Sequence, residues 1–438
     1  MRTFYQLSVS YLIVAFFIVL TGCASTGKST NLSSSSAKSG SQKIQFSSPE
    51  KVGMSSERLN NVTKILNDYV ENGEFVGAVS MIARHGNVVH FEKFGDLNKD
   101  AKQAVELDSI FRIYSMSKPI TTIAAMMLYE EGKFQLTDPV AKYLPEFKNI
   151  LVLNESGQLE KQNQPFTIQM LMSHTAGLTY GVFGNTQVDQ QYRKAGILGN
   201  KDLAEMVTEL GKIPLQYQPG SKWHYSVSVD VLGRLVEVLS GQPLDVFLEE
   251  RIFDPLEMND TFFQVPGDKI NRFGTNHRYN PKTQKLEVID SPETSQYTKE
   301  VTFFSGGGGL LSTAEDYMKF CQMMLNGGSF NGHQILGSKT IDYMTQNHLK
   351  GIFANRSGEN GQNRPGSGFG LGFGVLLDAA EAGVIGSEGE YYWGGAAGTV
   401  FWIDPVEDLI AIVMVQHMNV QVPLRKTMKA AIYGSLID

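Results

Sequence analysis

Ser115 and Lys118 are the residues of this 438-residue chain whose types and spacing most directly indicate covalent chemistry. They stand three positions apart at the start of an apolar, helix-like segment, 120–131, which Gly132 ends. Residues three apart on a helix share a face, so the lysine amine can reach the serine hydroxyl. A lysine serves as a base when its surroundings favour the neutral amine, and a helix N-terminus favours developing negative charge. The pair therefore predicts a serine nucleophile assisted by a lysine.

This spacing alone is weak, because it recurs three times near the N-terminus. Those copies open no apolar helix and are interpreted as chance: Ser25/Lys28, Ser35/Lys38 and Ser48/Lys51. Stronger support comes from two further segments. Residues 219–226 contain Tyr225 and precede an apolar helix that starts near Asp230, and residues 391–396 lead into a strand.

Together with residues 171–178 and 307–316, these ordered motifs resemble serine hydrolases built like class C β-lactamases and penicillin-binding proteins. The resemblance is closest to their family VIII esterase branch, and it extends from about Lys51 to the C-terminus. It implies a β-lactamase/transpeptidase-like fold and an acyl-enzyme mechanism. We expect no cofactor and no metal.

The resemblance assigns roles to the matching residues. Ser115 would attack the carbonyl carbon, and Lys118 would take or share its proton. Tyr225 would help to activate Ser115 and would protonate the leaving group. The backbone N–H groups of Ser115 and Ala396 would form an oxyanion hole beside the substrate-binding residues Trp393, Gly394 and Gly395.

Two positions depart from the lactamase pattern. Tyr225-Ser226-Val227 lacks the Asn of Tyr-x-Asn, and Trp393-Gly394-Gly395 replaces Lys-Thr-Gly. A tryptophan offers apolar area and cannot pair with a carboxylate, which favours neutral, partly apolar esters as substrates. Trp393 packed near a sheet edge and Tyr225 as a buried structural tyrosine are the plainer alternatives.

Three functions follow from these residues. The leading hypothesis is a carboxylic-ester hydrolase that acts on a small ester or amide. The second is a β-lactamase or D,D-peptidase. The third is a non-catalytic lipoprotein that binds the cell wall, and the intact set of Ser115, Lys118 and Tyr225 argues against it.

The N-terminus has the pattern of a secretory signal. Arg2 is followed by an apolar run at 12–20, which is short for a transmembrane span. The sequence Leu-Thr-Gly-Cys that ends at Cys23 resembles the lipobox of bacterial lipoproteins. This resemblance implies a signal peptide at 1–22, lipidation of Cys23 and stable membrane anchoring. An uncleaved helical anchor is the alternative.

Ala24 after the lipidated position resembles the outer-membrane pattern of Gram-negative bacteria. We therefore expect a protein of the bacterial cell envelope, lipid-anchored to the outer membrane and facing the periplasm. Residues 23–48 have the composition of a flexible tether, and the hydrolase domain is expected at 49–438. Residues 22–29 match a phosphate-loop pattern, but no helix follows them, so nucleotide binding is set aside.

Strands near both ends of the chain predict how these residues are positioned. The expected elements are a helix at 54–70 capped by Ser55 or Ser56, strands at 75–83, 88–91, 399–403 and 409–415, and a helix at 422–436. A helix-rich stretch fills roughly 115–260. The fold class is therefore α/β (α+β): an antiparallel sheet flanked by N- and C-terminal helices, plus an all-helical region. The active site is expected between the two parts.

The remaining features exclude other chemistry. A net charge of −7 without a long basic run argues against nucleic-acid binding. No G-x-S-x-G elbow occurs, and the eight histidines lack metal-ligand spacing. His174 is interpreted as structural, His224 as a neighbour of the site, and Cys321 as a buried thiol. The glycine run at 306–309 is expected to turn into a helix with a capping box of Ser312 and Glu315.

Overall fold

The computed structural model describes residues 44–349 and 365–438. The expected signal peptide at 1–22, Cys23 and residues 23–43 of the expected tether lie outside the described residues. The end of that tether is part of the fold, because β1 (Gln45–Phe46) pairs in parallel with β3 (Asn87–Asn98). The folded part therefore begins before the expected residue 49, since the backbone of this segment extends an edge of the sheet.

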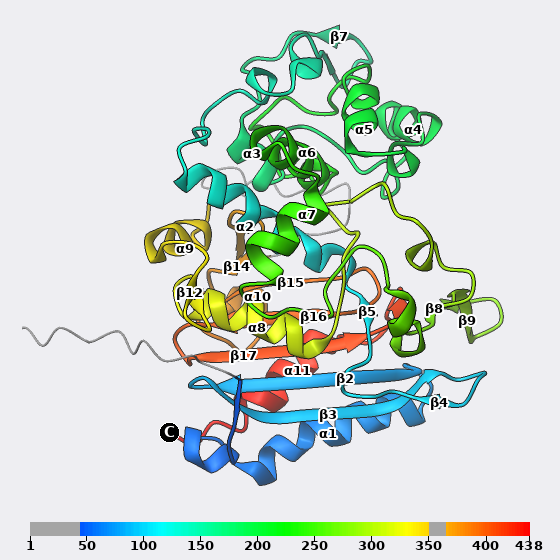
Figure 1. Ribbon diagram of the computed structural model, residues 1–438, viewed down its shortest axis with the longest axis vertical. Helices are drawn as coiled ribbons and strands as arrows, with labels where there is room; N and C mark the ends of the chain where they lie inside the picture. Colours follow the sequence, from blue (N-terminus) through cyan, green and yellow to red (C-terminus); the bar gives the residue numbers. More distant parts are fainter. Residues whose placement is uncertain (1–43, 350–364) are drawn as a thin grey trace, which may run out of the picture. The chain divides into compact units, whose positions relative to one another are not determined.

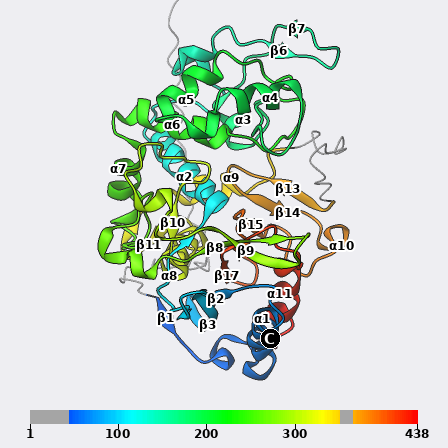
Figure 2. The ribbon, with the colours of Figure 1, turned by 90° about the vertical axis from the view of Figure 1, so that its right-hand side faces the viewer.

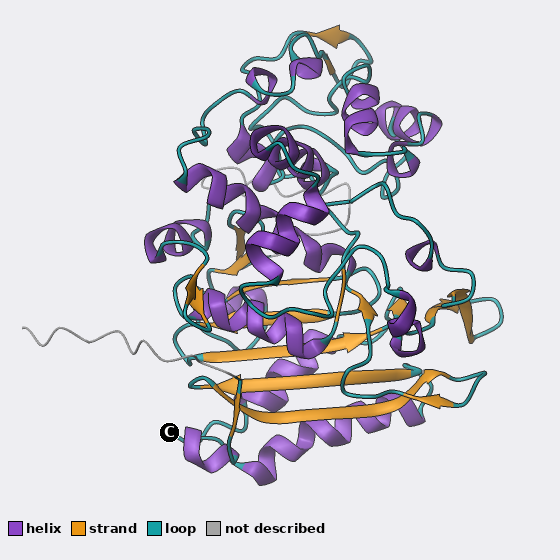
Figure 3. Cartoon of the chain, in the orientation of Figure 1, coloured by secondary structure: helices purple, strands orange, loops and turns teal. Residues whose placement is uncertain are grey.

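A central sheet assembled from both ends of the chain organises the fold (Figures 1 and 3). Among the described residues it has nine strands in the order β1-β3-β2-β17-β16-β15-β14-β13, with β4 paired to β3. The bounds of the other strands are β2 (Gly77–Arg84), β4 (Gln103–Ala104), β13 (Ser367–Phe369), β14 (Gly374–Leu376), β15 (Tyr391–Gly394), β16 (Val400–Asp404) and β17 (Leu409–Val415). β2 and β17 run antiparallel side by side, which confirms a sheet that joins both chain ends.

Helices cover both faces of this sheet. α1 (Ser56–Glu71) and α11 (Leu424–Tyr433) pack together on one face, and α8 (Ala314–Leu325) lies on the other (Figures 1 and 2). Successive residues of a strand point to opposite faces, so β2 contributes to two cores. Val79 and Met81 join the core on the α8 side, whereas Ala78 and Ile82 join the core between the sheet and helices α1 and α11.

Of two helix caps expected from the sequence, one is confirmed and the other is wrong. Ser55 caps α1 as expected, with its Oγ accepting from the Arg58 N–H at 3.3 Å. The expected cap of α8 at Ser312 is wrong by one residue, because Thr313 Oγ1 accepts from the Asp316 N–H at 3.2 Å. Ser312 belongs to the preceding strand, and this pairing leaves the next residue to cap the helix.

The part between the chain ends is mainly helical (Figure 2). Its helices are α2 (Ser117–Glu130), α3 (Ile168–Met172), α4 (Gln187–Lys194), α5 (Leu203–Leu210), α6 (Ser228–Ser240) and α7 (Leu244–Leu248). α6 packs against α2, α3, α5 and α7. The expectation of an all-helical region needs one correction, because a hairpin of β6 (Val152–Leu153) and β7 (Leu159–Glu160) interrupts it. Asn154 Oδ1 accepts the N–H groups of Ser156 and Gln158, which stabilises the turn of this hairpin.

Smaller strands hold the segment that precedes Ser115. The remaining named elements include β5 (Phe111–Arg112), β8 (Asn276–Asn280), β9 (Lys285–Asp290), β10 (Leu311–Ser312), β11 (Ser329–Phe330), β12 (His333–Gln334), β18 (His417–Met418), α9 (Ser338–Met344) and α10 (Ala379–Ala382). β5 pairs with β10, and its Arg112 is fully buried. The guanidinium donates to Asp290 at 2.7 Å and to Gln416 at 3.1 Å, so an ion pair of this buried arginine fixes β5.

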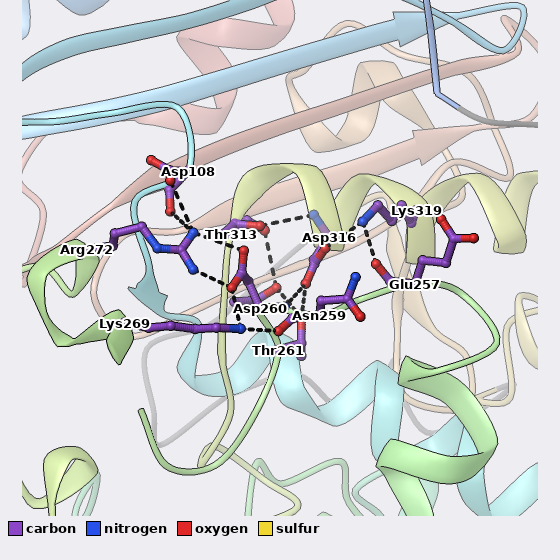
Figure 4. Close-up of polar contacts among 11 residues, drawn as sticks. Asp108, Glu257, Asn259, Asp260, Thr261, Lys269, Arg272, Thr313, Asp316 and Lys319 are labelled. Atoms are coloured by element: carbon purple, nitrogen blue, oxygen red, sulfur yellow. Dashed lines mark hydrogen bonds and ion pairs between the residues drawn. The ribbon is translucent and has the colours of Figure 1, made fainter. Parts of the chain in front are cut away.

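A polar network ties the segment after α7 to the first turn of α8 (Figure 4). Asp316 accepts from the Asp260 N–H at 2.6 Å, from Thr261 Oγ1 at 3.1 Å and from Lys319 Nζ at 2.8 Å. The Asp260 carboxylate in turn pairs with Arg272. Burial raises the pKa of Asp316, and the ammonium of Lys319 opposes this shift. Thr261 Oγ1 also lies 2.8 Å from Ser312 Oγ, so the network reaches β10, the partner of β5.

The α8 core also contains Cys321, which is fully buried, as expected for a core thiol. Burial raises the pKa of this thiol well above its ordinary value. A thiol in this environment remains protonated and unreactive at neutral pH.

Asp316→Ala is expected to lower the free energy of unfolding by about 2 kcal/mol, because the Asp260 N–H and Thr261 hydroxyl lose a buried acceptor. Urea denaturation measures this change. Asp342 is a matched control, because it also pairs with a lysine three positions away but is 54% exposed, against 5% for Asp316. Asp342→Ala should leave the unfolding midpoint unchanged; equal effects of both substitutions would contradict the anchoring role.

Candidate active site

Ser115 lies in a strained turn directly before α2. The turn is a 3₁₀ helix, η2 (Tyr114–Met116), in which Tyr114 has φ of +42°. A side chain other than glycine in this region costs on the order of 1 kcal/mol. Two contacts hold it: Asn276 Nδ2 donates to Tyr114 OH at 2.9 Å, and Ser117 Oγ donates to the Tyr114 carbonyl at 2.6 Å. The turn leaves the Ser115 side chain partly exposed at the N-terminal end of α2.

Lys118 is fully buried on the first turn of α2. Its Nζ donates to Ser115 Oγ at 3.1 Å, to Tyr180 OH at 3.2 Å and to the carbonyl oxygen of Gly307. The same nitrogen lies 4.5 Å from the ring centroid of Tyr225. All four partners are uncharged groups, and they hold the amine beside the serine hydroxyl.

Tyr225 reaches the same hydroxyl from another element. It precedes α6, 110 positions from Ser115 in the chain, and its OH donates to Ser115 Oγ at 2.6 Å. Ser115 Oγ therefore lies within hydrogen-bonding distance of both Lys118 Nζ and Tyr225 OH. The structure therefore brings together the three residues that the sequence singles out, as the predicted chemistry requires.

Asp230 lies behind this group and was not recognised from the sequence as a site residue. It is fully buried on α6, and its Oδ1 accepts from Ser305 Oγ and from the Gly307 N–H at 3.0 Å. Burial raises the pKa of Asp230, and the positive charge of Lys118 opposes this shift. A Cβ at Gly307 would lie 2.4 Å from Asp230 Oδ2, so only glycine fits here. The glycine run thus allows a close backbone approach that presents the Gly307 carbonyl to Lys118.

The end of β15 meets the turn that contains Ser115. A Cβ at Gly395 would lie 2.5 Å from the carbonyl oxygen of Ile113, so the two backbones approach closely. The Gly395 N–H donates to the Thr399 carbonyl at 2.8 Å, which closes the turn between β15 and β16. Ala396 follows in this turn and is exposed. The segment 393–396 therefore lies next to the nucleophile segment, where the sequence analysis expected it.

Aromatic rings surround Tyr225. The rings in contact with it, by centroid distance, are His174 at 4.8 Å, Tyr180 at 5.4 Å, Trp393 at 5.6 Å, and Trp223 and Phe183 at 6.2 Å. Phe369 lies against both Trp393 and Trp223, at 5.2 and 5.6 Å. β15 is paired on both sides along Tyr391 and Tyr392, whereas Trp393 itself pairs only with Phe401 of β16. The Trp393 ring forms part of an apolar wall beside the candidate nucleophile.

The two histidines near the site differ in their contacts. His174 is almost fully buried, and its Nδ1 lies 3.3 Å from Ser226 Oγ. Burial and the nearby Lys118 hold the pKa of His174 well below its ordinary value, so the ring is neutral. His224 contacts Thr179 and Tyr217 and lies beside the site. The geometry fits a packing role for His174, as expected from the sequence.

Tyr180, Phe183 and Phe369 are further site residues that the sequence analysis missed. Tyr180 follows the family-like segment 171–178 by two positions, which is the only signal that pointed near it. Their contacts with Lys118, Tyr225 and Trp393 depend on loops whose path the sequence does not specify.

The family model described as Beta-lactamase matches residues 62–432, and the chain belongs to that family. It is a serine hydrolase, which confirms the resemblance found in the sequence.

Particular relatives agree with this assignment. Protein Rv1367c of Mycobacterium tuberculosis (strain ATCC 25618 / H37Rv) is 31% identical over 359 residues, covering 80% of this chain and 88% of that protein. Esterase EstB of Burkholderia gladioli is 28% identical over 379 residues, covering 82% and 91%. The solved structure of EstCE1, a hydrolase with promiscuous acyltransferase activity, has a TM-score of 0.73 at 27% identity. The match covers 86% of this chain and 99% of that chain.

Lys118→Met should slow the covalent labelling of Ser115 by a fluorophosphonate by about 10²–10⁴-fold, because methionine cannot accept the serine proton. Tyr180→Phe removes only one hydrogen-bond partner of the amine, and a loss of about five-fold is expected. Intact-protein mass spectrometry over time gives both rates, and circular dichroism controls for folding. Labelling of Lys118→Met at the unaltered rate would remove Lys118 from the mechanism.

Proposed function

We propose that this protein is a carboxylic-ester hydrolase that forms an acyl-enzyme on Ser115. The observation that carries the proposal is the convergence of Lys118 Nζ and Tyr225 OH on Ser115 Oγ, at 3.1 and 2.6 Å. Such an arrangement of a nucleophile with proton-transfer groups in hydrogen-bonding reach is what covalent catalysis by a serine requires.

The reaction has two steps. Ser115 Oγ attacks the ester carbonyl and passes its proton to the Lys118–Tyr225 pair. The bond to the leaving oxygen then breaks, and Tyr225 OH protonates the released alcohol. Water then attacks the acyl carbonyl, and its proton passes to the same pair. The bond to Ser115 Oγ breaks, the pair returns the proton to this oxygen, and the carboxylic acid leaves. The backbone N–H groups of Ser115 and Ala396 are proposed to bind the oxyanion, a role worth about 10²–10³ in rate per donor.

An ester fits the site better than a charged β-lactam. Trp393, Trp223 and Phe369 present apolar rings where a lactam carboxylate would need a cationic partner. The names of EstB and EstCE1 point in the same direction. The alternative from the sequence, a β-lactamase or D,D-peptidase, remains the competing outcome of the assay described next.

A panel of p-nitrophenyl esters, a chromogenic cephalosporin and a D-Ala-D-Ala peptide tests the proposal. We expect ester hydrolysis to dominate, and Ser115→Ala to abolish it while the thermal unfolding midpoint stays close to that of the unchanged protein. The substitution removes the attacking oxygen of a partly exposed side chain and leaves the packing intact. A clear preference for the cephalosporin or the peptide would reverse the assignment. Turnover by Ser115→Ala would exclude the acyl-enzyme.

We further propose that the protein is a lipoprotein of the bacterial cell envelope, anchored through lipid on Cys23 to the outer membrane and facing the periplasm. The support is the lipobox-like sequence that ends at Cys23 and the Ala24 that follows it. In the described part of the chain, no helix has the length and apolarity to span a membrane.

Cys23→Ser should move the protein from the membrane fraction to the soluble fraction, or leave an unprocessed precursor, because the acyl chains have no attachment point. Fractionation and the intact mass of the product measure this. Cys321→Ala is the control, since it changes the other cysteine of the chain and should leave the protein in the membrane fraction. An unchanged mass and location for Cys23→Ser would exclude lipidation.

A further inference from the structure

Two exposed apolar side chains stand at the edge of the active site. Val182 and Phe183 are 55% and 57% exposed. Single exposed apolar residues are common on protein surfaces and need no explanation. This pair differs in its position, because the Phe183 ring lies 5.3 Å from the ring of Tyr180 and 6.2 Å from that of Tyr225.

The loop that presents the pair is clamped at both ends by α4. Arg193 donates to the carbonyl oxygens of Gly181 and Gly184 and, at 2.6 Å, to Asn185 Oδ1. Asp189 accepts from the Thr186 N–H at 2.9 Å.

The loop is also fixed on the side that faces the site. Asp189 accepts a second hydrogen bond from Thr179 Oγ1 at 2.5 Å. Gly181 has φ of +77°, a conformation that few other residues adopt. The loop therefore holds Phe183 beside the site, although the side chains of Val182 and Phe183 expose apolar surface to water.

The position of Phe183 indicates which part of an ester this residue would contact, namely the alcohol portion. In the proposed reaction, Tyr225 OH must lie within hydrogen-bonding reach of the leaving oxygen in order to protonate it. The alcohol portion of the substrate then lies near the Tyr225 side chain, and Phe183 is one of the rings in contact with that side chain. The carbonyl oxygen belongs on the side of Ala396 and β15.

We propose that Phe183 binds the alcohol portion of the ester and selects bulky apolar or aromatic alcohols. This inference rests on the proposed function and specifies its substrate class. Phe183 is a specificity-determining residue that acts by apolar contact with the leaving group before and during acylation.

A plainer role for Phe183 is support of Tyr180, whose hydroxyl accepts from Lys118 Nζ. The two roles differ in their consequences. Loss of support would disturb Lys118 and slow the reaction with every ester to the same extent. Loss of an alcohol-binding contact would slow only esters whose alcohol is large enough to reach the loop.

Kinetics of the full-length protein in detergent with two ester series separate these roles. The first series varies the alcohol, with ethyl acetate and 1-naphthyl acetate. The second varies the acyl chain, with p-nitrophenyl acetate and p-nitrophenyl octanoate. Each variant is compared with the unchanged protein on the same ester, so the intrinsic reactivity of the leaving group cancels.

Phe183→Ala should lower kcat/KM for 1-naphthyl acetate roughly ten-fold more than for ethyl acetate. The octanoate-to-acetate ratio should not change. Phe183→Leu, which keeps apolar volume, should retain most of the preference. Val406→Ala is the matched control, because Val406 is also an exposed apolar residue, at 69%. It follows the far end of β16, whereas the near end, at Val400, pairs with Gly394 beside the site. This substitution should change neither ratio.

Equal losses on all esters would assign Phe183 to the support of Tyr180 and overturn the inference. A changed octanoate-to-acetate ratio would place the acyl chain on this loop and overturn it as well. Normal turnover with unchanged ratios would overturn the inference and leave the proposed function standing. Failure of the unchanged protein to hydrolyse any of the esters would overturn both.

Discussion

Two groups hydrogen-bond to a single oxygen atom, Ser115 Oγ, and many contacts of the fold hold this geometry. A lysine amine and a tyrosine hydroxyl must both reach it, and the amine of Lys118 must do so inside the protein. A buried amine is costly unless its hydrogen bonds are made. Tyr180 OH and the Gly307 carbonyl provide them, and Asp230 holds Gly307 in place.

The fold explains how such a group is held. The segment that leads to Ser115 begins at β5, and an ion pair between the buried Arg112 and the partly exposed Asp290 fixes β5 to β8 and β9. The network around Asp316 reaches β10, the partner of β5, through the hydroxyl groups of Thr261 and Ser312. The strained conformation of Tyr114 persists because the structure on both sides determines it. Polar contacts far from the reacting atoms thus serve the geometry at Ser115.

The apolar character of the site follows from the same arrangement. Tyr225 is enclosed by rings from several separate segments, so its hydroxyl is directed to Ser115 by packing as well as by hydrogen bonding. These rings make one side of the site apolar. A neutral, apolar ester suits such surroundings, whereas a charged substrate would lose its hydration without a counter-ion.

From the sequence alone, Ser115 could be singled out as the candidate nucleophile with Lys118 and Tyr225 as its partners, and the sheet built from both chain ends could be predicted. These predictions were possible because motif spacing and strand periodicity are properties of residues that are neighbours in the sequence. Several such motifs in the same order also gave the family resemblance. The β6–β7 hairpin, the cap at Thr313, and the places of Tyr180, Phe183 and Asp230 were decided by the tertiary structure. These features depend on loop paths and on contacts between residues far apart in the chain. No local pattern encodes such contacts, because their free energy arises only when the whole chain has folded.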